Sequence, residues 1–112
     1  MQIPRDAVLL RIFIGESERF AGKPMYEAIV LKARELKMGG ATVLRGPLGF
    51  GQSSHLHSAK ILRLSEDLPI VIEIVDSQQK IDAFMPELDK MMGSGLITTE
   101  KVQVLQYGND KS

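Results

Sequence analysis

The sequence contains no cysteine, no tryptophan and no excess of either charge. Without cysteine the chain cannot form a disulfide scaffold, a thiolate nucleophile or a cysteine-ligated metal centre. Fourteen basic residues balance fourteen acidic ones, so no broad field attracts a nucleic acid or an anionic membrane. Aromatic residues make up only 5%, which argues against stacking platforms for single-stranded nucleic acid. We therefore expect no nucleic-acid partner, and any bound anion must be held by a local group of residues.

Long apolar runs are missing as well. No stretch approaches the ~18 residues of a membrane span, and the N-terminus lacks the apolar segment of a signal peptide. We therefore expect a cytoplasmic protein. Hydrophobic residues nevertheless make up 44% of the 112 residues and charged residues 25%, which is typical of globular chains. Residues 1–112 are enough for a single domain with one core.

Apolar residues recur in a pattern that predicts strands and two helices in the order β-α-β-β-α-β. The first helix begins near Pro24, which suits an initial turn, and ends at Gly39–Gly40. The second follows a capping-box pattern that starts at Asp76, is bent by Pro86, and ends at Gly93. The expected strand regions are Ala7–Ile14, Ala41–Leu44, Ala59–Leu64, Ile70–Val75 and Leu96–Ile97 with Val102–Tyr107, followed by a polar tail at Gly108–Ser112.

This order predicts a ferredoxin-like α+β sandwich, an antiparallel sheet with two helices on one face and the first and third strands side by side in the centre. The isoleucines of Ile70–Val75 point to one side of the sheet and its valines to the other. The helices can cover only one of these apolar faces, so we expect an oligomer to cover the second. Glu73 in this strand needs a partner, for which Arg11 on the neighbouring strand is best placed.

A glycine-rich segment runs from Gly39 to Gly51. Glycine lets backbone N–H groups approach an anion or a planar base closely, and Arg45 can add a bidentate phosphate contact. The alternative is a helix C-cap followed by an ordinary hairpin loop. Between Arg45 and Ser58 we expect no packed element, and a loop of this length in so small a domain is more often functional than not. Its composition predicts that Gly46–Ser58 is mobile.

The remaining candidates are weaker. The turn Gly93-Ser94-Gly95 is, by itself, a helix C-cap. His55 and His57 share one face of an extended segment and could bind a divalent metal or a phosphate, but two histidines alone do not make a site. We recognise no nucleophilic triad, P-loop or pair of catalytic carboxylates, so we do not expect an enzyme.

Four motifs point to one family when they are taken together. The longest, SEDLPIVIEIVD, runs from Ser65 to Asp76, and a second, RGPLGFG, runs from Arg45 to Gly51. With Thr42-Val43 and Gly93-Ser94-Gly95 they resemble the PII signal-transduction superfamily, and more closely its PII-like family called domain of unknown function 190. The resemblance covers nearly the whole chain, residues 6–107.

The resemblance implies a homotrimer whose sheets meet around the threefold axis and whose clefts between subunits each bind an adenine nucleotide. It implies that Gly46–Ser58 is the signalling loop, or T-loop, which acts on a protein target such as a membrane transporter or channel. Gly93–Gly95 matches the phosphate-side turn, or B-loop. The nucleotide-binding residues that it implies are Gly40, Thr42, Arg45, Gly46, Gly49, Phe50, Gly51, Gly93, Ser94, Gly95 and Leu96.

The departures from the PII pattern concern phosphate binding. PII proteins follow the B-loop glycine with a lysine, where this chain has Leu96, and the basic residues after the last strand are replaced by Gln106 and Tyr107. Each missing cation removes a charge-assisted bond worth about 1.5–3 kcal/mol. The sequence therefore predicts AMP or ADP rather than ATP as the ligand, with no required cofactor. The alternative function is a CutA-like trimer that binds divalent metal through His55 and His57.

Overall fold

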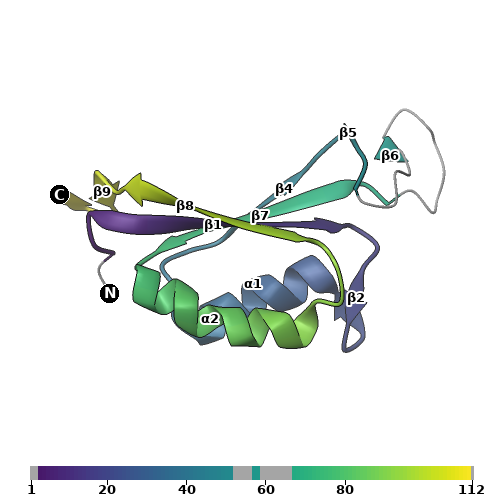
Figure 1. Cartoon of the computed structure of the whole chain (residues 1–112), viewed down its shortest axis with the longest axis horizontal. Coiled ribbons are helices and arrows are strands. Elements are labelled where there is room, and N and C mark those ends of the chain that lie inside the picture. Colours follow the sequence, from purple (N-terminus) through teal and green to yellow (C-terminus); the bar gives the residue numbers. More distant parts are fainter. Residues whose placement is uncertain (1–2, 52–56, 59–66, 112) are drawn as a thin grey trace.

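The structure, a computed structural model, describes residues 3–51, 57–58 and 67–111. Its main feature is a four-stranded antiparallel sheet with both helices on one face (Figure 1). The sheet consists of β1 (Asp6–Gly15), β4 (Thr42–Arg45), β7 (Pro69–Asp76) and β8 (Leu96–Gln103), and the helices are α1 (Met25–Glu35) and α2 (Gln78–Met91).

The strand order is β4-β7-β1-β8, so the first and third strands of the fold lie in the centre. β1 pairs with β7 from Val8 opposite Asp76 to Gly15 opposite Pro69. β4 and β8 form the two edges. The predicted ferredoxin-like sandwich is therefore confirmed, whereas the predicted strand Ala59–Leu64 lies outside the described residues.

The core lies between the sheet and the helices because the central strands alternate in burial. Every second residue of β7 from Ile70 onward is buried, while the residues between them are partly exposed. β1 has the same alternation, and its buried side chains belong to the same face of the sheet. The buried cluster comprises Val8, Leu10, Ile12, Ile14, Met25, Ala28, Ile29, Ala33, Ile70, Ile72, Ile74, Ile81, Phe84, Leu88 and Met91.

The first helix ends earlier than the sequence predicts. α1 stops at Glu35, before the expected glycine pair, and Lys37 takes a left-handed conformation with φ of 60°. The Lys80 ammonium donates to the carbonyl oxygen of Lys37 at 2.9 Å, which supports this turn without glycine. α2 contains Pro86 and continues to Met91. In the described ranges, neither helix combines the length and apolar character that crossing a membrane requires.

Three short two-stranded ladders lie outside the main sheet, and the expectation of no packed element between Arg45 and Ser58 was wrong because one of them falls there. β2 (Arg19–Phe20) pairs with β3 (Lys23–Pro24) after β1. β5 (Leu48–Gly49) pairs with β6 (His57–Ser58) and joins the two ends of the predicted mobile loop. β9 (Gln106–Tyr107) pairs with β10 (Asp110–Lys111). Gln106–Tyr107 was expected within the last strand region, but β8 ends at Gln103, and the expected polar tail contributes half of a hairpin. Ladders this short have no hydrophobic period by which sequence alone could reveal them.

The helix-free face of the sheet carries two rows of side chains that cross all four strands. One row is apolar and consists of Leu44, Val71, Phe13 and Leu96. The adjacent row contains the predicted ion pair, in which Arg11 Nε donates to Glu73 Oε2 at 2.9 Å. Arg11 Nη1 also donates to Glu100 Oε1 at 2.6 Å. The hydrogen bond to Glu73 raises the pKa of the Arg11 guanidinium, which stays charged.

Asp76 joins the end of β7 to two neighbouring segments. Its side chain is 1% exposed, and its carboxylate accepts hydrogen bonds from Gly39 N at 2.8 Å and from Ser77 N at 2.7 Å. The cap of α2 comes instead from Ser77, whose hydroxyl accepts from Lys80 N at 3.1 Å. Asp76 therefore fixes the connection that leads from α1 into β4.

We expect Asp76→Ala to lower the free energy of unfolding by about 2–3 kcal/mol, since it leaves two backbone donors without their charged acceptor. Chemical denaturation measures this change. The control is Asp82→Ala, which removes only an exposed hydrogen bond from Gln78 and should change stability by less than about 0.5 kcal/mol. Equal effects of the two substitutions would contradict the role given to Asp76.

Candidate functional site

The predicted site residues fall into two groups on opposite edges of the sheet. Thr42 and Arg45 lie on β4, with Gly46 directly after it, whereas the turn Gly93–Gly95 leads into β8 at Leu96. The pairing places Leu44 and Leu96 in the same row of the sheet, so both groups lie toward the same end. Three interstrand steps of about 4.8 Å separate the edges by ~14 Å.

The β4 group leads into the predicted T-loop. Gly46 N donates to the carbonyl oxygen of Pro69 at 2.8 Å, which holds the loop base against the start of β7. Gly49 pairs opposite His57 in the β5–β6 ladder. Phe50 is 70% exposed and is not a member of the buried core cluster. An exposed aromatic ring beside a glycine-rich segment is suited to stacking on a planar ligand.

Arg45 has an intramolecular partner that was not predicted from the sequence. Its guanidinium Nη2 forms an ion pair with Glu16 Oε2, from the loop that follows β1. The Arg45 side chain is 53% exposed and that of Glu16 28%. The guanidinium can therefore be reached by a solvent anion, but that anion must compete with a carboxylate already in place.

The β8 group is built around a backbone conformation that requires glycine. Gly95 has φ of 133°, and a Cβ at this position would lie 2.9 Å from the carbonyl oxygen of Phe13. Nothing lies within 4 Å of a Cβ built at Gly93, and Ser94 is exposed. Leu96 is 56% exposed and offers no charge to a phosphate. The turn can therefore present backbone N–H groups but no cation.

Gln106 and Tyr107, which stand where the resemblance would place basic residues, belong to the C-terminal hairpin. The Tyr107 hydroxyl donates to the carbonyl oxygen of Gly39 at 2.6 Å, and the Gln106 amide donates to the carbonyl oxygen of Gly108 at 2.9 Å. Gly40 follows Gly39 and leads to Thr42 at the start of β4. The hairpin therefore holds the segment before β4 in place, at the end of the strand away from Arg45.

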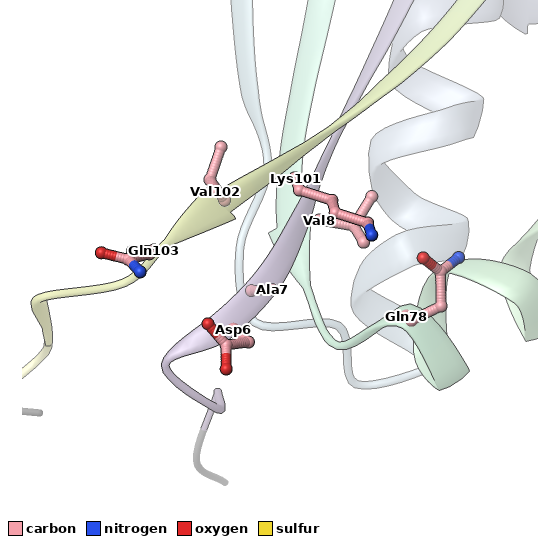
Figure 2. Close-up of a pocket in the computed structure, with 7 residues that line it drawn as sticks. All are labelled: Asp6, Ala7, Val8, Gln78, Lys101, Val102 and Gln103. Atoms are coloured by element: carbon pink, nitrogen blue, oxygen red, sulfur yellow. The ribbon is translucent and has the colours of Figure 1, made fainter.

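A groove of about 540 Å³ lies away from both groups (Figure 2). Asp6, Lys101 and Gln103 from the paired ends of β1 and β8 line it, and Gln78 borders it from the first turn of α2 (Figure 2). None of the predicted nucleotide-binding residues lines this groove. Within the described part of one chain, the predicted residues thus lie in two separate groups at the edges of the sheet, outside this groove.

The histidine pair gives no metal centre on the described residues. His55 lies outside them, and His57 belongs to β6. Across the described ranges, no three side chains of histidine, aspartate or glutamate are grouped to hold a metal ion. The metal-binding alternative therefore gains no support from the structure.

Comparison with known sequences gives a consistent family match. The family model DUF190, described as an uncharacterized ACR, matches residues 7–104. A UPF0166 protein of Aquifex aeolicus is 42% identical over 97 residues, which cover 87% of this chain and 91% of the relative. A UPF0166 protein of Methanocaldococcus jannaschii is 35% identical over 92 residues, which cover 81% of this chain and 84% of the relative.

Comparison with solved structures places the fold among PII-like proteins. CPII, a nitrogen regulatory PII-like protein from Thiomonas intermedia K12 in complex with ADP, AMP and bicarbonate, superposes with a TM-score of 0.60 at 16% identity over 88% of both chains. A second CPII structure, with ADP, AMP and acetate, gives a TM-score of 0.55 at 16% identity over 93% of this chain and 92% of the other. At this identity the likeness shows the fold.

The two turn glycines should respond differently to substitution. We expect Gly95→Ala to lower the free energy of unfolding by about 1–3 kcal/mol, because its φ is unfavourable and its new methyl meets a backbone oxygen. Gly93→Ala should change stability by less than about 0.5 kcal/mol, since the space around it is open. Thermal unfolding of both variants measures the difference, and a tolerated Gly95→Ala would mean that the turn is described wrongly.

Proposed function

This chain belongs to the DUF190 family, and from that membership we propose that it is a PII-like regulatory protein that binds an adenine nucleotide between the subunits of a trimer. The observation that carries the proposal is the split site, with Arg45 and the turn Gly93–Gly95 on opposite edges at one end of the sheet. Two neighbouring copies can bring such halves together in one cleft. The CPII complexes support the ligand class, because that protein of the same fold is bound to ADP and AMP.

The trimer also accounts for the helix-free face. Leu44 and Leu96 are 48% and 56% exposed at the two ends of the apolar row, and Val71 and Phe13 between them are half-buried. A row of this kind on a sheet with helices on one side only is suited to burial against another sheet. The PII-like fold of the chain favours three copies around one axis.

Sedimentation at micromolar concentration should give one species of three chains. Leu96→Asp should shift it toward monomer, because a carboxylate in the apolar row would have to be buried in the interface. Leu105→Asp is the matched control, since Leu105 is 65% exposed and lies outside the row. A well-folded wild-type monomer would contradict both the trimer and the shared site.

Arg45 is the cation that we assign to the phosphates. One guanidinium and a few backbone N–H groups can satisfy one or two phosphates, whereas a third would lose its water without an equal partner. The ligand that fits best is therefore AMP or ADP.

Calorimetric titration with AMP, ADP and ATP tests this assignment. We expect AMP or ADP to bind at least as tightly as ATP, and Arg45→Ala to weaken binding by about tenfold or more. Arg34→Ala removes an exposed guanidinium from α1 and should leave the dissociation constants unchanged. Tight binding of ATP alone, unaffected by Arg45→Ala, would mean that the phosphates lie elsewhere.

The role that we infer is regulatory rather than catalytic. Arg45 directly precedes the loop whose two ends pair in the β5–β6 ladder. A ligand that binds Arg45 can therefore change how this loop is presented to a target protein, such as a transporter or channel. No observation favours the metal-binding alternative.

A further inference from the structure

Arg45, which the proposed function assigns to the phosphates of the nucleotide, forms an ion pair with Glu16. The Glu16 carboxylate has the charge and planar geometry of a phosphate mimic, and it already binds one Nη atom of the guanidinium. Because Arg45 is 53% exposed, a second anion can approach it from solvent.

The backbone around Glu16 is held at three successive residues. Gly15 N donates to Glu18 Oε2 at 2.6 Å, Glu16 N to the carbonyl oxygen of Leu68 at 2.8 Å, and Ser17 N to Asp67 Oδ1 at 2.7 Å. The approach of Asp67 is so close that a Cβ at Gly15 would lie 2.7 Å from its Cγ. The backbone of Glu16 is thus fixed at the start of β7, which also pairs with Arg45 on its other side, while none of these three bonds uses the Glu16 side chain.

We propose that Glu16 is a specificity-determining residue of the nucleotide site, which competes with phosphate for Arg45 and selects against highly charged ligands. The inference rests on the proposed function of Arg45. A bound phosphate displaces the Glu16 carboxylate, which remains tethered within a Debye length of about 8–10 Å. Each further phosphate then brings more negative charge near this carboxylate, so the penalty grows from AMP to ATP.

The competition is modest for the first phosphate and larger for the third. The ion pair is partly exposed, so its net contribution is small. Removing the Glu16 carboxylate should therefore tighten AMP binding by about two- to fivefold. Repulsion of the additional phosphate charges makes the gain for ATP at least about twice that for AMP. A residue with a purely structural role would not produce a gain that increases with ligand charge.

Calorimetric titration with AMP, ADP and ATP tests the proposal in the wild type, in Glu16→Gln, in Arg45→Ala and in the variant that carries both substitutions. We expect Glu16→Gln to increase the affinity for all three nucleotides, with the largest gain for ATP and the smallest for AMP. In the Arg45→Ala background, the gain from Glu16→Gln should be smaller. Glu35→Gln is the matched control, because it removes one carboxylate from an ion pair with Lys32 on α1. Thermal unfolding verifies that each variant is folded, and Glu16→Ala replaces Glu16→Gln if the latter is unstable.

The outcomes separate this inference from the proposed function. Nucleotide binding in wild type that Glu16→Gln leaves unchanged, or changes as little as Glu35→Gln does, overturns the inference alone. A uniform gain for all three nucleotides overturns the selection by charge. The absence of binding in both wild type and Glu16→Gln overturns the proposed function, and the inference with it. Binding that appears only in Glu16→Gln supports the competition directly.

Discussion

The pairing of β1 with β7 is the constraint on which the rest of the molecule depends. Both strands carry large aliphatic side chains at every second position, so a slip of one residue would turn the whole buried set toward the helix-free face. The same register brings Arg11 opposite Glu73 and leaves β4 and β8 as the edges. The placement of the two groups of predicted site residues on opposite edges therefore depends on the hydrophobic pattern of the central strands.

The elements that could be predicted from the sequence are those with a long, one-sided hydrophobic period. The central strands and both helices belong to this class, because burial on one face selects their side chains strongly. The β2–β3 and β5–β6 ladders and the strand β10 were not predicted, because a strand of two residues is too short to show a hydrophobic period. The end of α1 was predicted wrongly because Lys37, and not a glycine, takes the left-handed conformation. The hydrogen bond that supports this turn comes from Lys80 on α2, which is far away in the sequence.

Prediction of the candidate site has a similar limit. Arg45 and the glycine turns could be found because short motifs carry them, but Glu16 lies in a loop whose composition is merely polar. The sequence did hold a signal, though an indirect one. Gly15 pairs opposite Pro69, and Arg45 pairs opposite the next residue, Ile70, so the strand order brings the end of β1 near the end of β4. The proximity of Glu16 to Arg45 can therefore be recognised only when the register of β1, β7 and β4 is known.

The pairing of β1 with β8 has a consequence for how the chain is made. Asp6 pairs opposite Gln103, so one edge of β1 stays uncovered during synthesis until β8 has also been made. Contacts between such distant segments close large loops and slow the folding rate. During synthesis, the apolar β1 strand therefore exposes an unpaired edge to other nascent chains. Since β8 covers this edge in the folded sheet, aggregation through β1 is favoured most while β8 is still missing.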